Sequence, residues 1–264
     1  GDAARTAQLP ERCSVVNVGL SLFSDALRTQ DVEVVDVDWS IPAGGDDELI
    51  AALARLYGPR SVEIDEANQE VLRRLDQATP ALARVRRAGD VVPGLGERMV
   101  LHPGPPLEFS RFSDPLRRSV YATVVSAGWA QDSQEAQRLI EKGEIELGSA
   151  HDHSAALSMG TTFGPDDPVF EVHDPQGGKT AYCAINQGPG QRAWLGVDSP
   201  EAIEHQRWLR DVAGPLLDEV LRDEEPIDLF SIASQAVQMG DDVHVRLQSS
   251  TNLLIRALAP RIRT

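Results

Sequence analysis

Strand-like and helix-like segments alternate over the first sixty residues of this chain. Apolar runs at 14–19 and 32–37 have the length and composition of short buried strands. A helical pattern separates them at 22–30. Another, at 46–57, begins with acidic residues and stops at a Gly-Pro pair. Since parallel strands need a crossover between them, this order predicts a small N-terminal βαβ-type unit of the α/β class.

The remainder of the chain predicts a mixed, mostly helical α+β body. Apolar periodicity, N-cap residues and helix-stop glycines are the signals used. Helices are expected at 65–77, 81–87, 114–128 and 133–142 and over most of the chain from Ser199 onward, and short strands at 145–147, 169–172 and 181–185.

Two long segments rich in glycine and proline interrupt this body, at 89–106 and 160–190. Loops of such length inside a compact domain usually carry function. The domains expected are 12–60, an α/β unit; 61–198, a mixed body with Gly/Pro-rich loops; and 199–264, a C-terminal helical segment.

Charge and composition narrow the classes of partner. The chain has 25 Lys+Arg against 41 Asp+Glu, a net charge of −16. This acidity disfavours binding to nucleic acid or to an anionic membrane surface. No stretch reaches the about 20 apolar residues of a spanning helix, and the first residues lack a signal-peptide pattern. Two cysteines do not make a disulfide framework. We therefore expect a cytoplasmic protein that binds neither nucleic acid nor membrane.

A glycine-flanked lysine is the first candidate for binding an anion. Gly178-Lys179-Thr180 is similar to the end of a P-loop, but His173 stands where that motif needs glycine. Lys179 is therefore either a placed anion ligand or a solvated turn residue. Gly188 and Gly190 follow the last expected strand and could form an anion-binding nest or a plain turn.

Histidines are the main candidates for proton transfer. His102 lies in a constrained Pro/Gly segment and could act as a general acid or a hydrogen-bond donor. His151 and His153 could face the same side, but a zinc site needs a third ligand that the sequence does not mark. Each could equally be a structural or surface histidine.

A turn between two C-terminal helices concentrates further polar groups. Asp241, Asp242, His244 and Arg246 lie within six residues there. Such a junction can face a pocket, with the next helix N-terminus pointing in. The alternative is a capped, solvated turn.

Several segments together resemble one known family over about residues 15–260. In order along the chain they are VVPGLGERM (91–99), LHPGPP (101–106), HDH (151–153), AYCAINQG (181–188), RWLRD (207–211) and QMGD (238–241). They resemble the YlbE-like family, whose members accompany FdrA-type proteins. The family is associated with oxamate carbamoyltransferase, which interconverts carbamoyl phosphate plus oxamate with oxalurate plus phosphate.

The resemblance also has departures. The family's run of three histidines followed by asparagine is here His-Asp-His-Ser at 151–154, and the junction at 241–248 departs at Val245 and Gln248. Family members continue well beyond the position of Pro260. The resemblance thus implies a reduced variant, or a separate chain that supplies the C-terminal portion. It also implies an FdrA-like partner subunit and an anionic small-molecule substrate.

We predict a subunit of a carbamoyl- or acyl-transferring complex that acts on an amine or amide acceptor. A scaffold that supports a catalytic FdrA-like partner is the main alternative, and a metal-dependent hydrolase using His151 and His153 is another. No cofactor is expected with certainty; Mg²⁺ could bind Asp241 or Asp242. The expected catalytic residues are His102, His153, His244, Asp241 and Asp242, and the expected substrate-binding residues are Lys179, Asn186, Gly188, Gly190 and Arg246.

Overall fold

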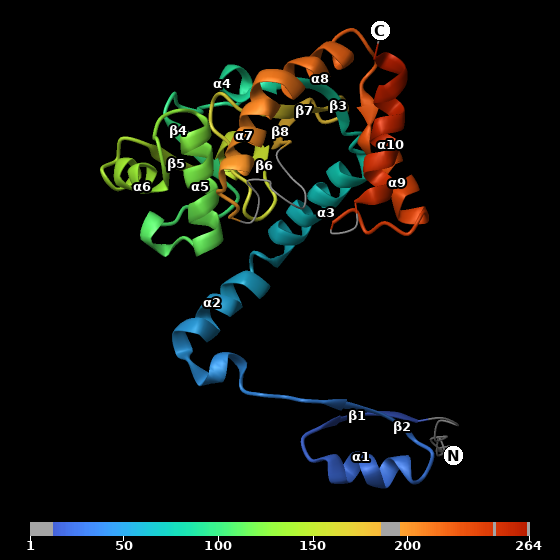
Figure 1. Ribbon diagram of the computed structural model, residues 1–264. Coiled ribbons are helices and arrows are strands. Elements are labelled where there is room, and N and C mark those ends of the chain that lie inside the picture. Colours follow the sequence, from blue (N-terminus) through green and yellow to red (C-terminus); the bar gives the residue numbers. More distant parts are fainter. Residues whose placement is uncertain (1–12, 186–195, 245–246, 263–264) are drawn as a thin grey trace, which may run out of the picture. The chain divides into compact units, whose positions relative to one another are not determined.

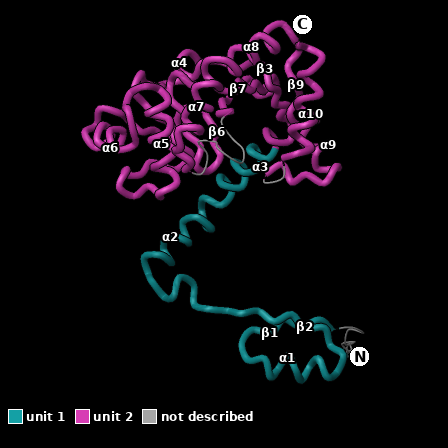
Figure 2. The backbone as a smooth tube through the Cα atoms, in the orientation of Figure 1, with its two compact units in different colours: residues 1–72 teal, residues 73–264 magenta. Residues whose placement is uncertain are grey.

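A computed structural model describes residues 13–185, 196–244 and 247–262. It divides into two compact units, residues 1–72 and 73–264 (Figure 2). Helices and small sheets alternate in the chain, so the expected mixed α/β class is confirmed. The three domains expected from the sequence stay a prediction.

Unit 1 contains a two-stranded parallel sheet with a helical crossover. Strand β1 (Ser14–Val18) pairs in register with β2 (Glu33–Val37), and α1 (Ser21–Arg28) connects them (Figure 1). Asp36 of β2 ties the unit together, because it accepts hydrogen bonds from Ser24, Asn17 and Arg28. These bonds, that of Ser24 foremost, lower its pKa to about 2. Helix α2 (Asp47–Tyr57) follows, and α3 (Ser61–Gln77) crosses the boundary of the two units.

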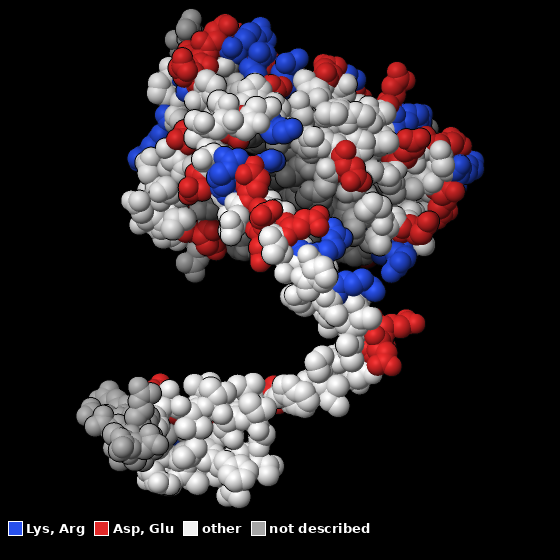
Figure 3. Space-filling model, turned by 180° about the vertical axis from the view of Figure 1, so that it is seen from behind, with Lys and Arg blue, Asp and Glu red and all other residues white. Residues whose placement is uncertain are grey.

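Unit 1 leaves most of its apolar side chains exposed. On the face shown in Figure 3, the surface over its small sheet is almost entirely uncharged. The exposed apolar residues of its strands, of α1 and of the adjoining turns include Val16, Val18, Leu20, Leu22, Phe23, Val35 and Val37.

Unit 2 is organised around a five-stranded sheet in the order β6-β8-β7-β3-β9. Strand β3 runs antiparallel to both of its neighbours, β7 runs antiparallel to β8, and the short β6 is parallel to β8. The strands are β3 (Ala81–Arg87), β6 (Ala155–Ala156), β7 (Pro168–Asp174), β8 (Lys179–Ala184) and β9 (Ile227–Asp228).

The segment 81–87 was expected to be a helix, and that expectation is wrong. Leu82 and Val85 are buried, at 2% exposure each, and their backbone is paired with β7 on one side. Its sequence, ALARVRR, has residues that form helices well in isolation. Here the sheet on both sides supplies pairing and burial that outweigh this propensity.

A second, two-stranded sheet lies beside two helices. Strand β4 (Met99–His102), which lies inside the first Gly/Pro-rich segment, is parallel to β5 (Glu146–Ser149), which follows α6 in the chain. Helix α5 (Asp114–Ser126) packs on it with Val120 and Val124, both fully buried, and α6 (Ser133–Glu141) completes this core. The short α4 (Ala88–Val91) precedes β4.

The C-terminal part is helical, but its first long helix is interrupted. Helix α7 (Pro200–Trp208) passes into a π-helical turn, Leu209–Ala213, before α8 (Gly214–Leu221). Pro215 explains the wider turn, because proline has no N–H for the ordinary i−4 bond and its ring crowds that carbonyl. Helices α9 (Leu229–Gln238) and α10 (Gln248–Leu258) follow. Within the described residues, no helix is both long and apolar enough to span a membrane.

Candidate functional site

Asp167 is a half-buried acid of unit 2 whose proton affinity is strongly raised. It lies in the turn 164–167, directly before β7, and its Oδ2 accepts a hydrogen bond from the Gly164 N–H at 2.8 Å. Burial raises its pKa to about 6, although the Gly164 N–H and the charge of Arg210 both act to lower it. A carboxyl group with such a pKa exchanges its proton close to neutral pH, as catalytic acids and bases do.

The turn that carries Asp167 is fixed by two prolines and by backbone bonds. Gly164 and Asp167 each precede a proline, which restricts both to extended conformations. The amides of Ala88 and Gly89 donate to the carbonyls of Asp167 and Pro165 at 2.9 and 2.8 Å. The Asp167 carboxyl is therefore held in place by the chain on both sides of it.

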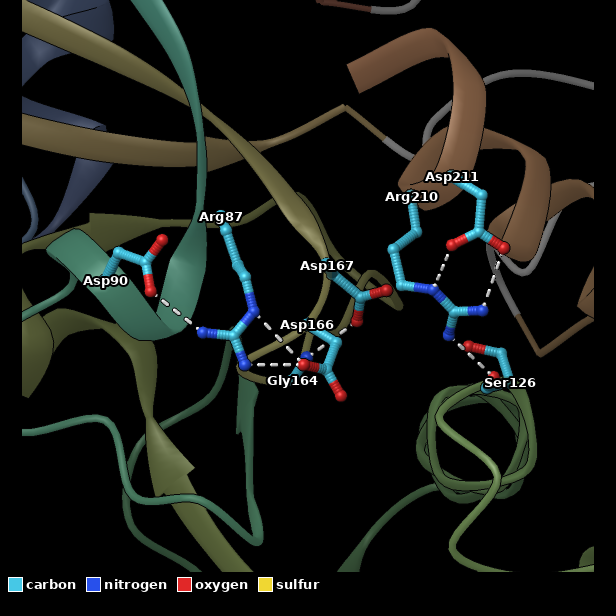
Figure 4. Close-up of polar contacts among 8 residues, drawn as sticks. All are labelled: Arg87, Asp90, Ser126, Gly164, Asp166, Asp167, Arg210 and Asp211. Atoms are coloured by element: carbon cyan, nitrogen blue, oxygen red, sulfur yellow. Dashed lines mark hydrogen bonds and ion pairs between the residues drawn. The ribbon is translucent and has the colours of Figure 1, made fainter. Parts of the chain in front are cut away.

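Arg210 stands beside this acid on the π-helical turn (Figure 4). Its Nη1 donates to the Ser126 carbonyl at the end of α5 at 2.9 Å, and its Nε and Nη2 donate to Asp211. The hydrogen bonds with Asp211 raise its pKa further, so it is charged at all accessible pH values. The π turn directs this cation toward α5 and Asp167, which fits the frequent occurrence of such turns at functional sites.

A chain of buried side-chain hydrogen bonds ends at Gln206 of α7. Thr162 Oγ1 donates to the Ser119 carbonyl and lies 2.9 Å from Thr123 Oγ1. Thr123 must therefore donate to Thr162, which leaves it only an acceptor for Gln206 Nε2 at 3.4 Å. This order of donors fixes the Gln206 amide, whose Oε1 is buried and has no hydrogen-bond partner in the described structure.

Gln206 and Asp167 line the same small pocket. Its volume is about 10 Å³, and its apolar walls include Phe163, Pro168 and Leu209. That volume holds about one water-sized group. The pocket is thus lined by a half-buried carboxyl group, by the hydroxyl-bearing Thr162 and by Gln206, whose amide oxygen has no partner in the described structure.

An arginine-rich pocket of about 340 Å³ shares Pro168 with it. Arg86, Arg87 and Arg210 line this larger pocket, together with carboxylates that include Asp166. Arg87 donates to Asp166 at 2.6 Å, as Figure 4 shows. Guanidinium groups in a pocket of this size can bind a carboxylate or phosphate bidentately, provided that the ligand displaces such internal partners.

His102 ends β4, and His153 lies in the short 3₁₀ turn Ala150–His153 that follows β5. His102 is 2% exposed and packs edge-on against Phe112. Burial lowers its pKa, and its Nδ1 accepts from the Gly104 N–H, so the neutral ring carries its proton on Nε2. His153 Nδ1 lies 2.7 Å from the Pro93 carbonyl and must donate to it.

The other predicted residues do not join this arrangement in the described structure. Lys179 is exposed at the start of β8, opposite Asp174 in the hairpin. Burial raises the pKa of Asp241, but hydrogen bonds from Ser250 outweigh it and hold that pKa below its usual range. Asp241 therefore ties α9 to α10.

Asp242 and His244 are exposed in the same turn, where Asp242 Oδ1 accepts from the His244 N–H. Asn186, Gly188, Gly190 and Arg246 lie outside the described residues. The catalytic and binding roles expected for all of these residues stay predictions.

The sequence interpretation missed Asp167, Gln206 and Arg210. Asp167 was visible as one of two acids held between prolines, in GPDDP, and Arg210 lies in the RWLRD segment, to which no role was given. Gln206 had no sequence signal, because its importance comes from the hydroxyl chain that holds it.

No group of three or more His, Cys, Asp and Glu side chains gathers as a metal site within the described ranges. His151 is exposed and His153 is engaged with a backbone carbonyl. The Mg²⁺ site considered at Asp241 or Asp242 stays a hypothesis.

Comparisons with known proteins give relatives that are longer than this chain. The chain is 34% identical over 250 residues to the uncharacterized protein YahG of Escherichia coli K12, across 94% of this chain and 53% of that protein. It is 32% identical over 201 residues to the oxamate carbamoyltransferase subunit AllG of the same organism, across 75% of this chain and 48% of AllG. The chain thus spans about half the length of the curated relatives it matches.

A solved structure has a similar fold. It is a conserved protein of unknown function from Enterococcus faecalis V583, with a TM-score of 0.72 and 32% identity, across 75% of this chain and 48% of that one. The YlbE-like resemblance and the FdrA-like partner stay predictions. Residues 145–264, which include Asp167, Gln206 and Arg210, match the family model of the oxamate carbamoyltransferase subunit AllG.

Proposed function

We propose that this chain is part of a subunit of a carbamoyl- or acyl-transferring complex that acts on an amine or amide acceptor, as an oxamate carbamoyltransferase does. The observation that carries the proposal is the match of residues 145–264 to the AllG family. The perturbed acid and the arginine beside it lie within that stretch. An anionic small molecule is the substrate class.

The chemistry of the site fits such a transfer. The nitrogen of the acceptor attacks an activated carbonyl carbon, the leaving group departs with the electron pair of its bond, and the nitrogen must lose a proton. Asp167, ionised above a pKa of about 6, would accept that proton. Arg210 or Arg87 would bind the charge on the donor or on the carbonyl oxygen.

The proposal also includes a partner subunit and further binding residues of this chain. An FdrA-like subunit would assemble with this chain, and the length that the relatives have in addition would lie on the same or a separate polypeptide. His102 would contribute a neutral N–H donor from Nε2, as its Nδ1 is engaged by the Gly104 N–H. Lys179 and Arg246 would bind phosphate or carboxylate.

The test is reconstitution. The full chain is expressed with and without an FdrA-like protein and supplied with carbamoyl phosphate and oxamate, and phosphate release and oxalurate formation are measured. We expect turnover with the partner and little without it. An assembled complex that releases no phosphate above background argues against a transferase, and full turnover by the chain alone argues against the partner.

A scaffold role is the second candidate, favoured by the internal pairing of the arginines. Arg87 is bonded to Asp166 and Asp90, and Arg210 to Asp211. If these pairs serve only stability, Asp167→Asn leaves the kcat of the complex unchanged. A general base predicts a loss of about 100-fold or more.

A further inference from the structure

We propose that the uncovered face of the small sheet in unit 1 is a docking surface for the part of the subunit that the longer relatives carry outside the match to this chain. Two residues from each strand form this valine face: Val16, Val18, Val35 and Val37. The inference rests on the proposed function, in that it takes the chain to be part of a longer subunit, and it names the surface on which the remainder binds.

The register of the two strands defines the valine face. Strands β1 and β2 are parallel, and each of the four valines lies directly opposite a valine of the other strand. Between these pairs, Asn17 lies opposite Asp36 and donates to it at 3.0 Å, and Asp36 also accepts from Ser24 of α1. Successive side chains of a strand point to opposite faces, so the four valines lie on the side of the sheet away from α1.

No element of unit 1 covers the valine face in the described structure. The four valines are between 40% and 65% exposed, and Ser24 alone is buried among the described residues 13–72. A two-stranded sheet is at best marginally stable in water, and parallel sheets have helices on both faces as a rule. Unit 1 therefore lacks one of the two layers that a parallel sheet needs.

The chemistry of the sheet defines what binds to it. Its uncovered side chains are apolar, and the surface over the sheet is almost entirely uncharged on the face shown in Figure 3, which suits the apolar stripe of an amphipathic helix. Strands β1 and β2 pair only with each other in the described structure, so their outer edges keep N–H and C=O groups for a further strand. The occupant is thus an α/β segment that supplies a helix for the valine face and a strand for one edge.

A second copy of this chain fits the valine face less well. Each copy has a net charge of −16, so two copies repel each other. Four valines are also far smaller than the about 800 Å² that each partner buries in a stable interface. A segment that extends the sheet adds backbone pairing and its own helices to the buried surface.

The relatives have enough additional chain for such a segment. The match to YahG covers 250 residues, which are 94% of this chain and 53% of YahG, so the remainder of YahG is nearly as long as the matched part. One βαβ unit takes only about 30 residues. Since the match includes most of unit 1, YahG has both the region that corresponds to the valine face and the additional length proposed to cover it.

The test is co-expression of the full chain with the remainder of YahG as a separate, tagged polypeptide. Affinity purification on the tag measures how much of the chain is retained. The parent should be retained, and Val16→Lys should be retained at least about 10-fold less, because docking would bury an unpaired ammonium group. Val62→Lys is the matched control and should behave as the parent, since Val62 lies on α3 and has the same exposure of 65%.

The stability of the lone chain distinguishes docking from cover by another part of the same chain. Val16 is exposed, so Val16→Lys and Val62→Lys should both leave the Tm of the lone chain unchanged. A Tm lowered only in Val16→Lys means that the chain itself covers the face, and it overturns the proposal. The proposal is also overturned if the parent is not retained, if Val16→Lys is retained equally, or if the lone chain is a dimer that Val16→Lys dissociates.

The docking surface and the proposed transferase fail separately. If the complex with the FdrA-like protein transfers no carbamoyl group while Val16→Lys still loses the remainder of YahG, the function is wrong and the docking surface stands. If transfer occurs and Val16→Lys binds the remainder as the parent does, the docking surface is wrong and the function stands.

Discussion

Replacing Asp167 by asparagine should make the protein more stable at pH 8. A pKa raised from 3.8 to about 6 means that the ionised carboxylate lowers the free energy of unfolding by about 3 kcal/mol at that pH. Asparagine is neutral, has the same shape, and its Oδ1 can still accept from the Gly164 N–H. The gain expected for Asp167→Asn is therefore about 3 kcal/mol.

The pH dependence of the free energy of unfolding tests the sign of this effect. Below pH 3.8 the carboxyl group is protonated in both the folded and the unfolded chain, so its contribution to stability is fully present. Between pH 3.8 and about 6 the unfolded chain has lost the proton while the folded chain retains it, so stability falls as the pH rises. The advantage of Asp167→Asn should then shrink to about half its pH 8 value at pH 5.

Urea unfolding followed by circular dichroism at pH 8 and pH 5 measures both quantities. The neighbouring substitution Asp166→Asn is the control, since it removes the ion pair with Arg87, partly exposed on both sides, and should lower stability by up to about 1 kcal/mol. A loss of stability in Asp167→Asn at pH 8, or a gain that does not change with pH, refutes the reasoning. A gain accompanied by a lower kcat of the complex is what a functional, destabilising acid predicts.

Three further outcomes are expected. Residues 73–264 alone should unfold cooperatively near the Tm of the full chain by calorimetry, because the buried apolar side chains of the described structure all lie there; a broad transition contradicts this. Gly214→Ala should lower the free energy of unfolding by about 1–3 kcal/mol in urea, since its Cβ would lie 2.8 Å from Pro168 Cβ; an unchanged midpoint contradicts the close packing. Asp218→Asn should cost about 1–3 kcal/mol at pH 7, by leaving Arg84 without its bidentate partner. Burial acts to raise the Asp218 pKa, but the hydrogen bond and charge of Arg84 hold that pKa below 3.8. The stabilisation by the Arg84–Asp218 pair is therefore present above pH 3.8 and is lost as the pH falls. Equal stability of variant and parent at pH 7 refutes the prediction.

Local signals in the sequence determined a large part of the fold. The order of strand and helix in the N-terminal unit followed from alternating apolar runs, and the structure has β1, α1 and β2 in that order. The Ser199-Pro200 start of α7 followed from capping, which acts within one turn of chain, and Ser199 caps it as expected. The sequence motifs also indicated a carbamoyltransferase subunit, and the match of residues 145–264 to the AllG family model agrees with that interpretation.

The tertiary structure alone decided β3 and the candidate site. Residues 81–87 form a strand because neighbours distant in the sequence pair with them, and no local propensity encodes that pairing. The pKa of Asp167 is set by burial beneath segments that meet only in the folded chain. Gln206 matters only because Thr162 and Thr123 fix which of its amide atoms is left over. Capping and periodicity act between residues close in sequence, whereas desolvation and hydrogen-bond direction depend on what surrounds a group in space.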